Sequence, residues 1–416
     1  MFFLYQIIIF IILVFSPIII VFRIYRNKEH KVRFSEKFSF SSKKRIKGKL
    51  IWFHGASVGE ILSIVPLIKN YEKNKSITQI LVTSSTLSSS KVLEKFKFKK
   101  TIHQFYPIDN SFFTNKFLKF WKPHMAVFVD SEIWPCMFKN INDKKIPLIL
   151  LNARITKKTF KKWMKLKNFG RSIFNKITIA YPQNLETETY LKKLKTNKLI
   201  RLGNLKFAEN FEKNLDKISN NFEKEMIKKK IWVASSTHKN EELFCAKAHI
   251  HLKKKVKNLI TIIIPRHIHR SKDITSEIEN LGLKVTNHMS KLRNLKNTDI
   301  YIVDTFGETQ KFHKIGCSVF FGGSISFKGG QNPLEAARFG AKILHGPNTD
   351  NFKDVYKLLK SLNISKVIRT PKELASSITF KKNKSKGNKI KIIGQNILKK
   401  TIKELDYFVI NEFKKT

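Results

Sequence analysis

Short, nearly continuous apolar runs recur along the chain and constrain its fold more than any other feature. They alternate with helix-like segments between residues 50 and 201, and the alternation resumes at residue 231. Such runs, without period-two alternation, are typical of strands buried on both faces of a parallel sheet. The runs are Leu50–Phe53, Gln79–Thr83, Ala126–Val129, Pro147–Leu151, Ile177–Ala180, Ile231–Ser235, Leu259–Pro265, Ile300–Asp304, Ser318–Gly322 and Ala341–His345. We therefore predict two doubly wound α/β domains.

The length of 416 residues also favours two domains, because single hydrophobic cores stop growing at about 250 to 300 residues. The strongly charged stretch 208–230 predicts a helical linker between an N-terminal domain, 35–207, and a C-terminal domain, 231–380. Within the remaining segment, 381–416, we predict a mobile basic loop up to residue 389 and a helix beyond it.

The first 22 residues carry no charge and are almost entirely apolar. About 20 such residues suffice to cross a bilayer. A cleaved signal peptide would have a basic start and a small-residue cleavage site, and this segment has neither. Arg23, Arg26, Lys28 and Lys31 follow the apolar run. The positive-inside rule then predicts one uncleaved anchor, with the rest of the chain in the cytoplasm. A monotopic hairpin and a buried core helix are the alternatives.

The formal net charge of +50 favours anionic partners such as phosphates or an acidic lipid surface. The excess is mostly lysine spread over the whole chain, so a compositional bias explains it equally well. No nucleic-acid-binding signature accompanies the charge. The three cysteines, Cys136, Cys245 and Cys317, show no pairing pattern, which is typical of buried thiols in a reducing compartment.

The segment HGASVGE, residues 54–60, joins a predicted strand to a predicted helix. It places Glu60 at the carboxyl end of a buried strand, where open α/β sheets bind ligands. Glu60 is therefore the first catalytic candidate, although acidic residues in a first helical turn often only complement the helix dipole.

Further charged groups follow other first-half strands. Asp130 and Glu132 come after Ala126–Val129, where they suit acid and base chemistry or, equally, capping of the next helix. Arg154 and Lys206 add cations that suit neutralisation of an anionic ligand or a place on the surface.

The second half carries features suited to a phosphate or nucleotide. Ser235–His238 offers hydroxyls and amides at a predicted helix start, and Arg266 ends a strand, where a guanidinium suits bidentate phosphate contacts. Phe306–Glu308 lies in a similar position, and the glycine pairs at 322–323 and 329–330 lead to Glu335. The sequence lacks a P-loop, a GxGxxG after the first strand and a metal-ligand spacing, so we expect metal-independent chemistry without a cofactor.

With these residues the chain resembles the 3-deoxy-D-manno-octulosonic acid (Kdo) transferases of lipopolysaccharide assembly, which are GT-B type glycosyltransferases. The resemblance extends from the apolar amino terminus to about Phe352. Its motifs, in chain order, are HGASVGE, SEIWP, LNARI, GNLKF, ASSTHKNEE, PRH, DTFGE and GGQNPLEAA.

The resemblance implies inverting transfer of Kdo from CMP-Kdo to the lipid A precursor at the inner face of the cytoplasmic membrane. Glu60 matches the family's general base, and Asp130 and Lys206 match positions that stabilise the transition state. The segments that match CMP-binding positions are Pro265, Arg266, Phe306, Gly307, Glu308, Asn332, Pro333, Leu334 and Glu335. The implied partners are the lipid A precursor, the donor and the membrane, with no nucleic acid.

Several positions depart from the family pattern. Asp130 and Ser131 stand where the family usually has Glu and Thr, so Glu132 competes with Asp130 for the second catalytic role. The other departures are Cys136 for Asn, Gln331 for His, and Ile268 and His269 for Pro and Glu. Another GT-B-like membrane-associated sugar transferase, a nucleotide-sugar epimerase and a membrane-tethered nucleic-acid-binding protein are the alternative functions.

Overall fold

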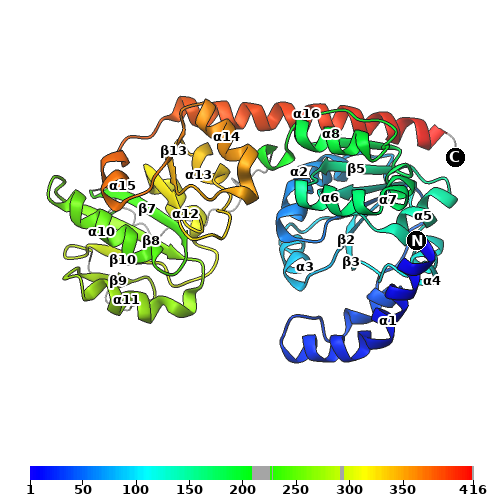
Figure 1. Ribbon diagram of the computed structural model, residues 1–416, viewed down its shortest axis with the longest axis horizontal. Helices are drawn as coiled ribbons and strands as arrows, with labels where there is room; N and C mark the ends of the chain where they lie inside the picture. Colours follow the sequence, from blue (N-terminus) through cyan, green and yellow to red (C-terminus); the bar gives the residue numbers. More distant parts are fainter. Residues whose placement is uncertain (209–224, 227, 291–294, 415–416) are drawn as a thin grey trace. The chain divides into compact units, whose positions relative to one another are not determined.

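The computed structural model describes residues 1–208, 225–226, 228–290 and 295–414 (Figure 1). The chain forms two compact units, one comprising Met1–Glu209 with Gly394–Thr416 (unit 1) and the other Asn210–Ile393 (unit 2). Most of the predicted linker, 208–230, lies outside the described residues.

Unit 1 contains a parallel sheet of order β3-β2-β1-β4-β5-β6 (sheet A), with helices on both faces (Figure 1). Its strands are β1 (Leu50–His54), β2 (Gln79–Ser84), β3 (Thr101–Phe105), β4 (Met125–Val129), β5 (Leu148–Ala153) and β6 (Ile179–Pro182). Its helices are α1 (Phe2–Tyr25), η1 (Arg33–Phe38), α2 (Val58–Glu72), α3 (Leu87–Glu94), α4 (Ser111–Trp121), α5 (Pro135–Asp143), α6 (Lys157–Lys165), α7 (Lys167–Phe174), α8 (Leu185–Lys193) and η2 (Leu205–Ala208). The strand order reverses between β1 and β4, and ligands bind at such switch points.

Unit 2 contains a second parallel sheet of order β13-β12-β11-β7-β8-β10-β9 (sheet B). Its strands are β7 (Lys230–Thr237), β8 (Leu259–Pro265), β9 (Val285–Asn287), β10 (Ile300–Ile302), β11 (Ser318–Phe321), β12 (Lys342–His345) and β13 (Ser365–Val367). Its helices are α10 (Glu241–Lys253), η3 (Ile268–Arg270), α11 (Ser271–Glu279), α12 (Thr309–Ile315), α13 (Leu334–Arg338), η4 (Asp350–Phe352), α14 (Lys353–Ser361) and α15 (Pro371–Ser377). The order reverses between β7 and β11. The prediction of two doubly wound parallel sheets is thus confirmed.

All ten predicted strands are present, with bounds shifted by at most two residues. The strands that the apolar pattern missed are β3, β9 and β13, which all lie at sheet edges. The edge strands β9 and β13 are covered less completely than central ones, so their sequences retain polar residues such as Thr286 and Lys366. In β3, His103 is buried, and its ring lies 2.8 Å from the Ser84 hydroxyl.

The prediction of a basic loop at 381–389 is wrong for most of its length, because helix α16 (Lys384–Lys414) already begins within it. The Asn383 side chain accepts a hydrogen bond from the backbone N–H of Lys386 at 2.9 Å, in the manner of a helix cap. A Cβ at Gly387 would lie 2.7 Å from the Arg338 carbonyl oxygen, so close backbone packing fixes this first turn.

Residues of α16 beyond Gly394 complete the core of unit 1. Leu405 and Val409 are buried beside Phe53, Tyr71 and other residues that cover one face of sheet A. The second face is covered by a cluster that includes Trp52, Trp121 and Phe128. Both faces are therefore buried.

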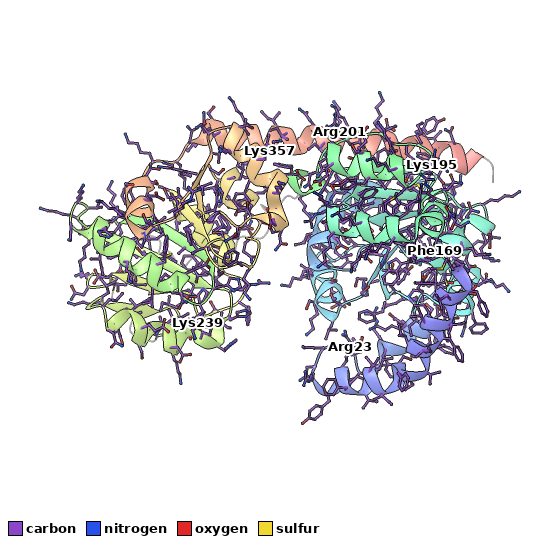
Figure 2. All side chains as sticks on the ribbon, viewed as in Figure 1. Arg23, Phe169, Lys195, Arg201, Lys239 and Lys357 are labelled. Atoms are coloured by element: carbon purple, nitrogen blue, oxygen red, sulfur yellow. The ribbon has the colours of Figure 1, made fainter. Side chains whose placement is uncertain are left out.

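Helix α1 has 24 residues and is long and apolar enough to cross a membrane, and most of its surface is exposed. Its first turns contact unit 1, where the Tyr5 hydroxyl donates a hydrogen bond to Asp109 at 2.7 Å. Phe169 packs against Tyr5, while Arg23 lies near the other end of the helix (Figure 2). Arg23 pairs with Glu29 at 3.1 Å, which joins the end of α1 to the loop that follows it.

Candidate active site

Glu60 lies on the first turn of α2, directly after the central strand β1 of sheet A. Ser57 is the N-cap, and its hydroxyl donates to Glu60 Oε1 at 2.9 Å. The backbone N–H of Ala56 donates to Glu60 Oε2 at 2.7 Å. Together with a capping box, in which the Ser57 hydroxyl accepts from the Glu60 N–H and the Glu60 carboxylate accepts from the Ser57 N–H, these bonds hold the carboxylate at the carboxyl edge of the sheet, on one side of the switch point.

The environment of Glu60 suits proton transfer at neutral pH. Burial, together with the negative charges of Glu132 and Asp130, raises the pKa of the Glu60 carboxyl to about 7. Hydrogen bonds from Ser57 and Ala56 oppose this rise. A carboxylate with a pKa near the working pH accepts a proton readily while a large fraction remains ionised.

Asp130 follows β4, on the other side of the same switch point, and is buried. Its Oδ2 accepts a hydrogen bond from the Lys206 ammonium at 2.8 Å, and its Oδ1 accepts one from the Asn152 amide. Asp130 and Asn152 have positive φ angles of 56° and 51°. Such backbone strain in non-glycine residues gathers at functional sites, where the surrounding structure maintains it.

Glu132 has different partners. It accepts a hydrogen bond from the Trp134 indole at 2.9 Å and lies 3.2 Å from His54 Nε2. The His54 ring stacks on Tyr106 with a centroid distance of 3.9 Å. Glu132 is thus held among aromatic rings, whereas the ion pair with Lys206 belongs to Asp130.

The alternative that Asp130 or Glu132 caps the following helix is wrong. Helix α5 begins at Pro135, and the Asp109 carboxylate accepts hydrogen bonds from the backbone N–H groups of Cys136 and Met137 at 3.0 and 2.8 Å. Asp109 comes from the loop after β3, so the sequence around Asp130 gave no sign of it.

In unit 2, the buried Glu241 organises the switch point of sheet B. Its Oε2 accepts hydrogen bonds from the backbone N–H groups of His238 and Gly323 at 2.9 and 2.7 Å. Its Oε1 accepts from those of Ile325 and Ser326 at 2.9 and 3.1 Å. One carboxylate thereby joins the loop after β7 to the loop after β11. The sequence analysis did not single out Glu241, which lies within the motif ASSTHKNEE.

Gly322 and the segment before Glu241 approach each other closely. A Cβ at Gly322 would lie 2.4 Å from the Ser236 carbonyl oxygen and 2.5 Å from the Thr237 Cα atom. Because both are backbone atoms, only glycine fits here. The segment Ser235–His238 precedes a helix, α10, which starts at Glu241 with Asn240 as its N-cap, but most of the segment belongs to β7, which ends at Thr237.

The residues predicted to bind a nucleotide lie at or beyond the carboxyl ends of three strands of sheet B, β8, β10 and β11. Pro265 ends β8, and Arg266 is exposed just beyond it. After β10, Phe306 is 80% exposed, and Glu308 pairs with Lys311 at 2.8 Å. The third segment follows β11 and consists of Asn332, Pro333, Leu334 and Glu335, with Pro333 and Leu334 buried.

Of the described residues, no three His, Cys, Asp or Glu side chains form a group that could hold a metal ion. The three cysteines are free, with Cys136 and Cys245 buried and Cys317 partly exposed. Burial raises the pKa of each thiol, which keeps it protonated at neutral pH.

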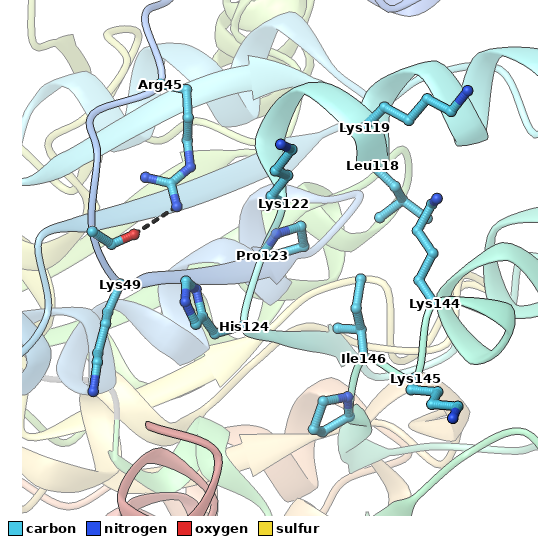
Figure 3. Close-up of a pocket in the computed structure, with 12 residues that line it drawn as sticks. Arg45, Lys49, Leu118, Lys119, Lys122, Pro123, His124, Lys144, Lys145 and Ile146 are labelled. Atoms are coloured by element: carbon cyan, nitrogen blue, oxygen red, sulfur yellow. Dashed lines mark hydrogen bonds between the residues drawn. The ribbon is translucent and has the colours of Figure 1, made fainter. Parts of the chain in front are cut away.

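A cavity of about 730 Å³ lies at the opposite, amino edge of sheet A, before β1, β4 and β5 (Figure 3). Figure 3 shows that its lysine side chains extend in different directions rather than toward one point. Lys122 and Lys144 are the C-caps of α4 and α5, where cations complement the helix dipole. Helix ends therefore account for part of the basic rim, and Arg45 and Lys49 come from the segment before β1. The lining residues are Arg45, Gly48, Lys49, Leu118, Lys119, Lys122, Pro123, His124, Lys144, Lys145, Ile146 and Pro147.

Comparison with solved structures concerns the fold. A putative UDP-N-acetylglucosamine 2-epimerase from Listeria monocytogenes superposes with a TM-score of 0.59 at 12% identity, over 89% of this chain and 98% of that one. TcCGT1 in complex with UDP gives a TM-score of 0.53 at 8% identity, over 87% and 100% of the two chains. At these identities the likeness shows a GT-B fold and says nothing about the substrate.

Sequence comparison identifies the family. A family model described as 3-deoxy-D-manno-octulosonic-acid transferase (kdotransferase) matches residues 32–209. The 3-deoxy-D-manno-octulosonic acid transferase of Rickettsia prowazekii is 36% identical over 84% of this chain and 76% of the relative. The enzyme of that name from Rickettsia bellii is 33% identical over 95% and 94%. A match over so much of both chains makes this protein a member of the 3-deoxy-D-manno-octulosonic acid transferase family, the Kdo glycosyltransferases of lipopolysaccharide synthesis.

Proposed function

We propose that this protein transfers Kdo from CMP-Kdo to the lipid A precursor (lipid IVA), with inversion at the anomeric carbon. The observation that carries the proposal is the pair of acidic groups at the switch point of sheet A, one with a raised pKa and one paired with lysine. Inverting transfer needs a base for the acceptor hydroxyl and stabilisation of charge as the donor bond breaks.

In this mechanism, Glu60 takes the proton from the acceptor's sugar hydroxyl as its oxygen attacks the anomeric carbon of Kdo. The bond from that carbon to the CMP phosphate breaks, and its electron pair leaves with the phosphate. Asp130 and Lys206 stabilise the transition state. Asp130 is favoured over Glu132 for this role because it holds the lysine, whereas Glu132 is engaged by Trp134 and His54.

Unit 2 is proposed to hold the donor nucleotide through its three loop segments. The Arg266 guanidinium is exposed and suits a phosphate, and the Glu335 carboxylate suits the hydroxyls of a ribose. Gly307, with φ of 89°, lets the backbone approach a ligand. The remaining contacts are assigned to Pro265, Phe306, Glu308, Asn332, Pro333 and Leu334. No resident cofactor or metal takes part.

We also propose that α1 anchors the enzyme in the inner membrane with both units on the cytoplasmic side, where the acceptor lipid is made. A helix that crosses the bilayer releases the contact between Tyr5 and Asp109, whereas a helix lying on the cytoplasmic surface keeps it. A cysteine placed at Phe3 should therefore react with a membrane-impermeant thiol reagent from the outer side of spheroplasts. Labelling only after the membrane is permeabilised would contradict a crossing helix.

Transfer by the purified full chain tests the reaction itself. With CMP-Kdo and tetraacylated lipid IVA, mass spectrometry should show a product heavier by the mass of one or more Kdo residues. Reactions without acceptor, or with UDP-sugars as donors, are the controls. Transfer from a UDP-sugar, or its epimerisation, in place of Kdo transfer would favour the alternative enzymes and overturn the proposal.

A further inference from the structure

A buried chain of hydrogen bonds connects Glu335 to the central strand of sheet B. Glu335 Oε1 and His313 Nδ1 are 2.8 Å apart, and His313 Nε2 lies 2.9 Å from the Ser235 hydroxyl oxygen. Ser235 belongs to β7, His313 to α12 and Glu335 to α13. Three segments separated in sequence therefore meet within unit 2 at one imidazole ring.

Two of the three residues in this hydrogen-bonded series are buried. Ser235 is fully buried and His313 is 3% exposed, while the Glu335 side chain retains 20% exposure. Ser235 is fixed because β7 pairs with both β8 and β11. The His313 ring also packs against Phe321, with a centroid distance of 5.5 Å. The histidine is thus immobilised between a rigid strand and a carboxylate that reaches the surface.

The two hydrogen-bond partners of His313 determine which ring nitrogen donates and which accepts. An ionised carboxylate only accepts hydrogen bonds, so Nδ1 must carry the proton toward Glu335. In the neutral ring Nε2 then accepts from the Ser235 hydroxyl. This arrangement fixes one oxygen of Glu335, and no described residue donates a hydrogen bond to the other, Oε2. That oxygen remains available to a ligand hydroxyl.

Glu335 needs such support because α13 is only five residues long and ends at Arg338. A long, flexible side chain on so short a helix loses conformational freedom when it binds a ligand, unless it is already held. We propose that His313, backed by Ser235, is a positioning residue that sets the Glu335 carboxylate for the vicinal hydroxyls of the donor's ribose. The inference rests on the proposed function, since it takes Glu335 as a nucleotide-binding group.

Binding of two nucleotides to the full chain tests this role. His313→Leu should weaken binding of CMP about tenfold, because one hydrogen bond to a charged group is lost. The variant should leave the affinity for 2′,3′-dideoxy-CMP unchanged, since that ligand has no hydroxyls for Glu335. His313→Asn keeps an amide donor near the position of Nδ1 and should recover most of the loss. If the His313 ring served only packing, its removal would instead weaken the binding of both nucleotides equally.

The matched control is His249→Leu, which removes another fully buried histidine of unit 2 that contacts Thr261 and Asp299. It should not change the ratio of the two affinities. Glu335→Gln should show the same selective loss as His313→Leu, and the double variant should lose no more than Glu335→Gln alone. Additive losses, or a selective loss in Glu335→Gln without one in His313→Leu, would overturn the role of His313.

The same measurements separate the inference from the proposed function. A wild-type chain that binds UMP in preference to CMP would overturn the proposed donor. In that case, a loss of affinity for UMP but not for 2′,3′-dideoxy-UMP in His313→Leu would still support the positioning role.

Discussion

Glu60→Gln is expected to lower kcat for Kdo transfer by about 10² to 10⁴, because the variant cannot accept a proton from the acceptor. Glutamine is nearly the same size and also serves in capping boxes, so the start of α2 should keep its structure. Affinity for CMP should stay within a factor of about two, since the nucleotide is assigned to unit 2. Initial rates with lipid IVA and titration with CMP measure the two quantities.

The wild-type rate should depend on pH as the Glu60 pKa requires. Because that pKa is about 7, kcat/KM should rise as pH increases through neutrality and level off above it. The variant should lack this rise. The matched control is Glu94→Gln, since this exposed carboxylate of α3 lies in the same unit, where it accepts a hydrogen bond from Ser90 at 3.0 Å and lies 3.8 Å from the Arg33 guanidinium. Unchanged turnover in Glu60→Gln would remove Glu60 from the mechanism.

Stability gives a second test of the Glu60 environment. A carboxyl whose pKa is higher in the folded than in the unfolded chain costs stability as pH rises above the unfolded pKa, and the cost is complete above the folded pKa, because the charged form is disfavoured in the fold. Glu60→Gln should therefore raise the Tm at pH 8. At pH 3.5, where the carboxyl is mostly neutral in both states, the Tm values should nearly coincide. A lower Tm at pH 8 would contradict the raised pKa.

Glu241→Ala is expected to destabilise unit 2 by about 3 to 5 kcal/mol and to abolish CMP binding. The substitution leaves the backbone N–H groups of His238, Gly323, Ile325 and Ser326 without their acceptor, and unsatisfied buried donors are costly. Urea unfolding and CMP titration measure these effects.

Glu241→Gln should also be costly, because its NH₂ group would face N–H donors that now share a carboxylate oxygen. The matched control is Glu279→Ala at the exposed end of α11 in the same unit, which should change the unfolding free energy by less than about 0.5 kcal/mol. If Glu241→Ala unfolds like this control, the carboxylate does not hold the two loops together.

The sequence alone predicted the two sheets because strands buried in a parallel sheet need nearly continuous apolar runs. Such runs can be recognised in the local sequence, without knowing which strands lie beside them. It also placed Glu60 and Asp130 at one edge, since both directly follow strands. The contacts that distinguish Asp130 from Glu132 join Asp130 to Lys206, 76 residues away. A contact between residues so far apart in sequence depends on the tertiary fold, and the local sequence pattern does not predict it.

The same limit explains Glu241, whose position at a helix start is one where glutamate commonly complements the dipole. Its bond to the N–H of Gly323 spans 82 residues. The start of α16 was missed because residues 381–389 include no apolar residue, and their Asn, Ser and Gly residues lower helix propensity, whereas Gly387 is needed there for close packing on residues 338–340. The roles of the individual site residues stay predictions until the variants are measured.

Helix α16 has a consequence for how the protein forms during synthesis. The ribosome completes sheet A well before residues 394–411, yet Leu405 and Val409 belong to the apolar layer on that sheet. Until they arrive, Phe53, Tyr71 and their neighbours face solvent on the nascent chain. Unit 1 therefore begins folding first and finishes after unit 2 has been translated, so its assembly is not strictly sequential from the amino terminus.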